Sequence, residues 1–315
     1  MGINIGVGIG SAGIGSAGIG TSGISIDPSP APPSYEGPLD LVPGAAFAWS
    51  QQALSASFTD PAIRLILDDV GDSEQDFAPT DDHSVSIAAV NTFKGANNAF
   101  HKVNYDQTGN DYDVTDFFTA QETNKPGWAV SAGSPLPTLG PRAGIPAVGN
   151  FPLGRDSAPN LSGGATIFLV VYNPGLSGGS ANPIQAYETD FGSEYWMIGV
   201  QDDLLRFQVG DSNNWDAFVD TTGFHLYEWT IDAAGQPAMW KDGVSIEVFL
   251  MSGSLTPIPS AATAILEYEV RSPTDGAAVT LGLYAGLCWP GALSAPNRLL
   301  IRQNMQSIFG TPALP

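Results

Sequence analysis

A run of oxygen-bearing side chains between residues 106 and 116 is a candidate metal site. Its members are Asp106, Asn110, Asp111, Asp113 and Asp116. Carboxylate and amide oxygens are the ligands that Ca²⁺ prefers. The run lacks the Asp-x-Asp-x-Asp-Gly order of an EF-hand, so a solvated loop is the alternative interpretation. Calcium held by Asp106, Asn110, Asp111 and Asp113 is therefore one hypothesis, and no other cofactor is expected.

The segment GDSNNWD at residues 210–216 predicts a polar loop that carries one aromatic ring. Aromatic rings among amide and carboxylate groups are typical of sugar-binding surfaces, where the ring stacks on a pyranose face. Asp211, Asn213, Asn214 and Trp215 are thus candidate glycan-binding residues, with ordinary packing of Trp215 as the alternative. Most of the other six tryptophans are expected in the core.

Other catalytic patterns are missing from the sequence. His83, His101 and His225 have no partners at catalytic spacing, and no Gly-x-Ser-x-Gly elbow or phosphate-binding loop is present. The single cysteine, Cys288, lies in the apolar run LYAGLCWPG. One cysteine forms no intramolecular disulfide and, with three scattered histidines, no zinc site. We expect a buried, inert thiol.

Composition restricts the classes of partner. Of 315 residues, 32 are acidic and 11 basic, which gives a net charge of −21. Such a chain repels phosphate backbones and anionic membranes, which argues against nucleic-acid and membrane partners. Neither a signal peptide nor a run of eighteen apolar residues is apparent.

The N-terminal segment repeats a glycine-rich pentad. From Ile9 it reads IGSAG, IGSAG, IGTSG, so that isoleucine recurs at Ile9, Ile14, Ile19 and Ile24. So much glycine opposes independent folding. Flexible linkers lack regularly spaced apolar residues, although a flexible tail is the alternative. We predict that residues 1–26 form a docking arm, which buries its isoleucines against other copies or another protein.

The rest of the chain divides into a linker and one domain. Residues 27–43 read DPSPAPPSYEGPLDLVP, which is typical of an extended proline-rich linker. The domain then covers residues 44–315. Its first elements are predicted as a short helix over 44–54 and a strand over 62–68.

From residue 165 the pattern is that of an all-β protein. The run ATIFLVVY (165–172) predicts a central strand buried on both faces. Alternation in HLYEWTID places Tyr227, Trp229 and Ile231 on one side of a strand. Turns are predicted at Asp202-Asp203 and at Lys241-Asp242-Gly243. Short strands at this spacing indicate a sandwich or jelly roll.

A helix is predicted near the C-terminus. Ser294 can cap it, Ile301, Met305 and Ile308 share one face, and Gly310 followed by Pro312 ends it.

Several segments, in the same order, resemble the catalytic domain of α-L-arabinofuranosidase B, particularly in its bacterial and phage-encoded relatives. They are PGAAFAWSQQAL (43–54), PAIRLI (61–66), SEQDF (73–77), NYDQTGN (104–110) and TNKPGW (123–128). NYDQTGN is the most specific, since it is similar to the Tyr-Asp-Gln-Ser-Gly-Asn signature of the family. The resemblance covers roughly residues 43–310 and implies a concanavalin A-like β-sandwich.

The resemblance also implies where the catalytic carboxylates of a glycosidase would lie in this sequence. A retaining glycosidase needs two carboxylates about 5–5.5 Å apart. The stretch matching the family's Glu nucleophile, YWMIGVQDDLL (195–205), offers only Asp202 and Asp203. The stretch matching its acid/base Asp, RSPTDGAAV, offers only Asp275 outside the family's Gly-Asp-Asn context. Asp202 and Asp275 are the catalytic candidates, and these departures argue against an enzyme.

We therefore expect a phage-type virion structural protein: a tail, fibre or head-decoration component. Its arm binds other virion proteins, and its lectin-like sandwich faces out toward host-surface glycan. The expected location is the virion, assembled in the bacterial cytoplasm, and a homo-oligomer such as a trimer is expected. The alternatives are an arabinofuranosidase-like glycoside hydrolase and a free lectin.

Overall fold

A computed structural model of the chain describes residues 35–67, 70–97, 99–116, 145–147, 153–155, 157–173, 180–187, 194–201, 203–210, 213–259, 265–268 and 281–310. These residues form one compact unit, which begins at Tyr35. The repeat isoleucines Ile9, Ile14, Ile19 and Ile24 lie outside the described residues.

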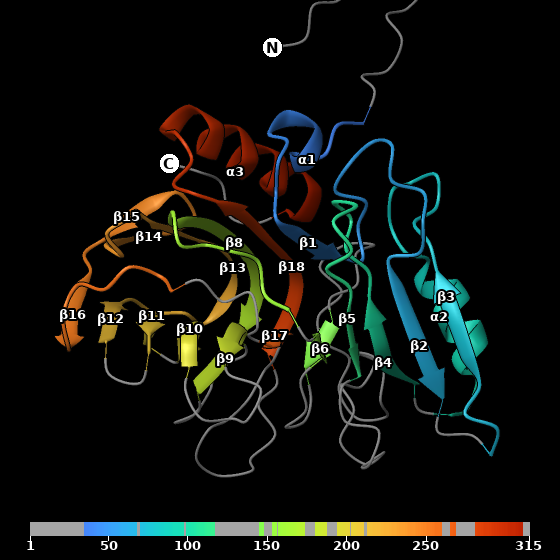
Figure 1. Cartoon of the computed structure of the whole chain (residues 1–315). Coiled ribbons are helices and arrows are strands. Elements are labelled where there is room, and N and C mark those ends of the chain that lie inside the picture. Colours follow the sequence, from blue (N-terminus) through green and yellow to red (C-terminus); the bar gives the residue numbers. More distant parts are fainter. Residues whose placement is uncertain are drawn as a thin grey trace, which may run out of the picture. The chain divides into compact units, whose positions relative to one another are not determined.

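The described strands form two stacked sheets, as the sequence predicted (Figure 1). The first sheet has seven strands, and its order is β1-β18-β8-β13-β14-β15, with β6 paired to β18. Their bounds are β1 (Phe47–Ser50), β6 (Ile145–Ala147), β8 (Ala165–Asn173), β13 (Gly223–Ile231), β14 (Pro237–Lys241), β15 (Val244–Ile246) and β18 (Leu281–Pro290).

The second sheet has eleven strands in the order β16-β12-β11-β10-β9-β17-β7-β5-β4-β2-β3. Their bounds are β2 (Ile63–Leu67), β3 (Glu74–Phe77), β4 (Ala99–Asn104), β5 (Val114–Asp116), β7 (Leu153–Arg155), β9 (Ser180–Tyr187), β10 (Glu194–Gln201), β11 (Leu204–Val209), β12 (Asn213–Phe218), β16 (Phe249–Ser252) and β17 (Ile265–Tyr268).

The main core lies between the two sheets. Tyr227, Trp229 and Ile231 of β13 all enter it and are fully buried, which confirms the alternation predicted from HLYEWTID. β8 pairs with β18 on one edge and β13 on the other. Because Phe168 and Val170 are also fully buried, β8 is covered on both faces, as predicted. Cys288 is buried too, and burial raises the pKa of its thiol, so it is inert as expected.

Helix α3 (Ala295–Phe309) covers the outer face of the first sheet (Figure 1). It begins where predicted, because the Ser294 side chain accepts a hydrogen bond from the backbone N–H of Asn297. It ends at Gly310, which has a left-handed φ of +66°. Ile301, Met305 and Ile308 form its buried face. No helix among the described residues is long and apolar enough to span a membrane.

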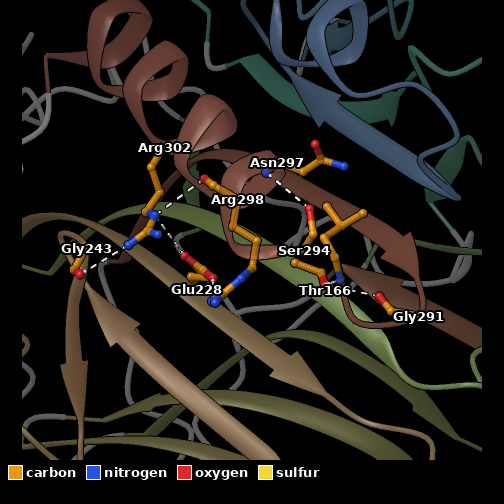
Figure 2. Close-up of polar contacts among 9 residues, drawn as sticks. Thr166, Glu228, Gly243, Gly291, Ser294, Asn297, Arg298 and Arg302 are labelled. Carbon is orange, nitrogen blue, oxygen red and sulfur yellow. Dashed lines mark hydrogen bonds and ion pairs between the residues drawn. The ribbon is translucent and has the colours of Figure 1, made fainter.

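A buried ion cluster fixes α3 to the first sheet (Figure 2). Glu228 of β13 is 1% exposed and contacts the guanidinium groups of Arg298 and Arg302, with an N–O distance of 3.3 Å to Arg302. Arg298 also stacks over the ring of Trp240 at 4.2 Å. Burial raises the pKa of the Glu228 carboxyl, and the two guanidinium groups oppose this effect.

The helix predicted over residues 44–54 is wrong. Residues 47–50 form strand β1, which pairs with β18 in a register that places Phe47 opposite Cys288 and Ser50 opposite Ala285. All four residues of β1 are buried. The alanine-rich composition favours a helix locally, but pairing with a strand more than 230 residues away overrides that preference.

Part of the predicted linker belongs to the folded unit. Residues 38–41 form a helical turn, α1 (Pro38–Leu41), and the neighbouring Val42 is 4% exposed. The carbonyl of Val42 accepts a hydrogen bond of 3.0 Å from the indole N–H of Trp289. The boundary therefore lies at Tyr35 rather than Gly44.

Two further elements were not predicted. They are strand β3 and helix α2 (Ile87–Lys94), which follows it with Ser86 as its cap. Val90 of α2 packs with Leu65 and Leu67 of β2 in a small core that is separate from those on either face of the first sheet. The predicted hairpins β10–β11 and β14–β15 are both present.

Removing the Glu228 carboxylate is expected to destabilise the protein. Glu228→Ala leaves two largely buried guanidinium groups without a counter-charge, which costs about 3–5 kcal/mol of unfolding free energy. Urea unfolding followed by circular dichroism measures the change. Glu247→Ala, at an exposed glutamate, is the control and stays within about 0.5 kcal/mol of the wild type. A loss below about 1 kcal/mol in Glu228→Ala would contradict the anchoring role.

Candidate functional site

The acidic loop after β4 is held by its own hydrogen bonds. Asp106 Oδ1 accepts from the backbone N–H of Ala48 at 2.9 Å and of Thr108 at 3.1 Å. Its Oδ2 accepts from the Thr108 hydroxyl at 2.6 Å and from the Tyr112 N–H at 3.1 Å. Asp113 in turn accepts from the Asp106 N–H at 2.7 Å. Gly109 and Asp111 adopt left-handed φ values of +78° and +61°. The loop is a tight structural turn.

The same loop covers the free edge of β1. The Gln107 side chain donates to the carbonyls of Ser50 and Gln52, both at 2.8 Å, and accepts from the Leu54 N–H at 2.7 Å. The backbone N–H of Gln107 donates to the Ala48 carbonyl. The Asn110 amide donates to the carbonyls of Ala45 and Ala46 at 2.9 and 3.1 Å. We call Asp106, Gln107 and Asn110 the edge clamp, because their side chains occupy the place of a neighbouring strand.

These contacts engage both carboxylate oxygens of Asp106 and one of Asp113, which are two of the four residues in the calcium hypothesis. Among the described residues, no group of three or more His, Cys, Asp or Glu side chains could hold a metal ion. Asp113 has a raised pKa, first because it is partly buried and also because Asp111 and Asp106 lie near it. The geometry of Asp106, Asn110, Asp111 and Asp113 thus lends the calcium hypothesis no support.

The histidines serve structural roles. The sequence predicted no partner at catalytic spacing, and His225 has two structural partners: its Nδ1 lies 2.6 Å from Asp242 Oδ2 and its Nε2 lies 2.9 Å from the Thr222 carbonyl. Both ring nitrogens are thereby engaged, so this pair is not a base poised beside a nucleophile. His101 is fully buried, and burial lowers its pKa to about 3. His83 stacks on Tyr35 with ring centroids 3.8 Å apart.

The catalytic candidates Asp202 and Asp275 lie outside the described residues, as does the glycan candidate Asp211. Asp203, next to Asp202 in the β10–β11 turn, is exposed.

The placement of Trp215 in an exposed loop is wrong. Trp215 lies in β12, is 2% exposed and packs in the main core beside Phe207 at 5.7 Å between ring centroids. The asparagines before it begin the strand, because they pair with Gln208 and Val209 of β11. The buried ring has no free face for a sugar. Asn213 is also engaged, since it accepts from Ser254 at 2.8 Å and donates to Val209 at 3.0 Å.

The opposite face of β11 and β12 carries a polar cluster that the sequence analysis missed. Because Phe207 and Trp215 point into the core, the alternating neighbours Arg206 and Asp216 point away from it. They form a two-pronged ion pair with N–O distances of 2.7 and 2.8 Å, and Asp216 is only 3% exposed. The alternation of residues in LLRFQV (204–209) could have indicated this face, because Arg206 and Gln208 fall on the side opposite Leu205 and Phe207.

Three more side chains complete this face. Gln208 and Asn214 lie opposite each other in the register. The Asn214 Oδ1 is buried and has no hydrogen-bond partner among the described residues. At the end of β12, on the same face as Asp216, the ring of Phe218 is 56% exposed. We call Arg206, Gln208, Asn214, Asp216 and Phe218 the outer polar face. An exposed ring beside fixed polar groups is the combination that sugar-binding sites use.

Solved structures that resemble this fold include GH54 α-L-arabinofuranosidases. One is a mutant soaked with 4-nitrophenyl α-L-arabinofuranoside, and another is an arabinofuranosidase complexed with arabinofuranosyl-α-1,2-xylobiose. Each matches with a TM-score of 0.66 and 16% identity over 87% of this chain. A third, soaked with a cyclic sulfate inhibitor, has a TM-score of 0.63.

The likeness establishes the fold and not the activity, since the identity is only 16%. The chain also spans 65% of the length of those enzymes. No family model and no curated protein matches the sequence. The predicted relation to the arabinofuranosidase B domain is thus supported as a relation of fold.

Truncating the clamp residue Gln107 is expected to weaken the fold. Gln107→Ala removes three hydrogen bonds and leaves buried backbone groups of residues 50–54 unsatisfied, which costs about 3 kcal/mol. Urea unfolding measures the difference. Gln75→Ala, at an exposed glutamine of β3, is the matched control. Equal stability of the two variants would contradict the clamp.

Proposed function

We propose that the chain is a structural component of a larger particle, of the kind that phage virions carry. In this proposal the arm, residues 1–26, anchors the protein, and the sandwich contacts host-surface glycan through the outer polar face. The observation that carries the glycan contact is the arrangement of Arg206, Asp216 and Phe218 on one face of β11 and β12.

The chemistry of this face suits a sugar. Asp216 fixes the Arg206 guanidinium through two hydrogen bonds, so this charged group loses little entropy when a sugar binds beside it. Phe218 offers an apolar surface for a sugar ring. The fold likeness to enzymes complexed with arabinofuranosides is compatible with this use, although it rests on analogy.

The particle role is supported by the arm. Residues 1–26 contain no charged side chain, in a protein with a net charge of −21. Regular isoleucines without charges favour burial against a protein surface over solvation. Other virion proteins are the proposed partners, and the virion is the proposed location.

Glycan binding is expected to depend on Phe218. An array of bacterial surface polysaccharides, with arabinofuranosyl-α-1,2-xylobiose included, should contain at least one ligand for the wild type. Phe218→Ala should weaken that binding about tenfold, or about 1.4 kcal/mol, because the stacking surface is lost. Val244→Ala, at an equally exposed residue of the first sheet, is the control. Absence of any ligand, or equal binding by both variants, would contradict the proposal.

The same preparation tests the hydrolase alternative. We expect no release of nitrophenol from 4-nitrophenyl α-L-arabinofuranoside. Release by the wild type that is lost in Asp202→Asn would favour the enzyme and overturn the non-enzymatic assignment.

Deletion of residues 2–26 is expected to abolish incorporation into particles while leaving the thermal unfolding temperature of the sandwich unchanged. Sedimented particles probed for the full-length and the shortened chain give the comparison. Undiminished incorporation of the shortened chain would remove the anchoring role.

A further inference from the structure

The second sheet ends in an apolar edge strand. Among the described strands, β16 pairs only with β12, and all four of its residues are exposed (Figure 1). Phe249, Leu250 and Met251 are 42%, 49% and 53% exposed, and Leu255 just beyond the strand is 49% exposed. We call these four residues the edge patch.

The edge patch departs from the way sheet edges are usually protected. Edge strands commonly carry charges, which discourage pairing with another chain. The opposite end of this sheet follows that rule, because Arg64 of β2 forms ion pairs with Glu74 and Asp76 of β3. In contrast, residues 248–259 contain no charged side chain. An exposed apolar edge of this kind is a surface for strand addition.

Strand β16 is also fixed in position before any partner binds. Leu250 and Phe249 pair with Trp215 and Asp216 of β12, and the Phe249 ring lies 6.1 Å from that of Phe218. The Ser254 N–H donates to Asn213, which fixes the turn after the strand. A preformed edge reduces the entropy lost when another strand binds.

The chain itself contains a segment suited to this edge. At its start, Ile3, Ile5, Val7 and Ile9 alternate with Asn4, Gly6 and Gly8. This strict alternation is the pattern of a strand with one apolar face, and β-branched residues favour strands. Seven residues with so much glycine do not form a sheet alone, so their backbone groups need an existing edge.

We propose that the strand of residues 3–9 from one copy adds to β16 of a second copy. Its backbone completes the open edge, and its apolar face covers the edge patch. The proline-rich segment at 28–33 favours an extended chain of about 3.1 Å per residue, which carries the arm toward a neighbour. This inference deepens the proposed function, on which it rests, by naming a second copy as one partner of the arm.

The test uses full-length chains, with mass measured by light scattering after size-exclusion chromatography. The wild type should form oligomers whose mass rises with concentration. The donor variant Ile5→Asp and the acceptor variant Leu250→Asp should each weaken self-association at least tenfold, since each places a charge in the new pairing. Mixed together they should associate, because the acceptor variant retains an intact arm and the donor variant an intact edge.

Leu299→Asp, at an equally exposed leucine of α3, is the control and should behave like the wild type. Circular dichroism should show unchanged folding in every variant, because each described site is exposed. A monomeric wild type would overturn the inference, as would oligomers that persist in either variant or variants that do not associate when mixed.

Particle assays separate this inference from the proposed function. If Ile5→Asp is monomeric while the chain lacking residues 2–26 enters particles normally, strand addition stands and the anchoring role fails. If deletion of residues 2–26 prevents incorporation while Ile5→Asp leaves oligomers intact, the anchoring role stands and strand addition fails.

Discussion

The need to satisfy backbone groups at sheet edges governs this protein. Strand β1 lies at the end of the first sheet, and β18 satisfies only one of its edges. The other edge is closed by side chains of Asp106, Gln107 and Asn110, which replace a missing strand. Because the clamp loop continues directly from β4 of the second sheet, it also joins the two sheets at this end. Buried backbone groups left without partners here would each cost about 1–3 kcal/mol.

Sequence patterns predicted what local periodicity determines. The spacing of apolar residues predicted the alternation of β13 and the burial of β8 on both faces. The same spacing, together with Ser294 and Gly310 at the ends, predicted helix α3. The predictions for residues 44–54 and Trp215 were wrong because β1 pairs with the distant strand β18, and because pairing with β11 makes the polar stretch around Trp215 a strand. The outer polar face was missed for a related reason: Arg206 and Asp216 are ten residues apart and meet only through the β11–β12 register.

The edge clamp gives a physical reason for the sequence resemblance to arabinofuranosidases. Its most specific segment, NYDQTGN, contains the three clamp residues, so its place in the fold is explained by hydrogen bonds to β1. A shared structural motif predicts a shared sandwich, and the solved structures agree with that. It carries no information on catalysis. The proposed functions rest instead on the outer polar face, the open edge at β16 and the uncharged arm.

Two sheet edges thus receive opposite treatment: β1 is sealed within the chain, and β16 is left for an added strand. Amide hydrogen exchange tests this contrast most directly, when peptides covering residues 47–50 and 249–252 are followed in the full-length protein at several concentrations. The account predicts that β1 is protected at every concentration and that β16 gains protection as concentration rises. Exchange at β16 that is fast and independent of concentration would contradict it.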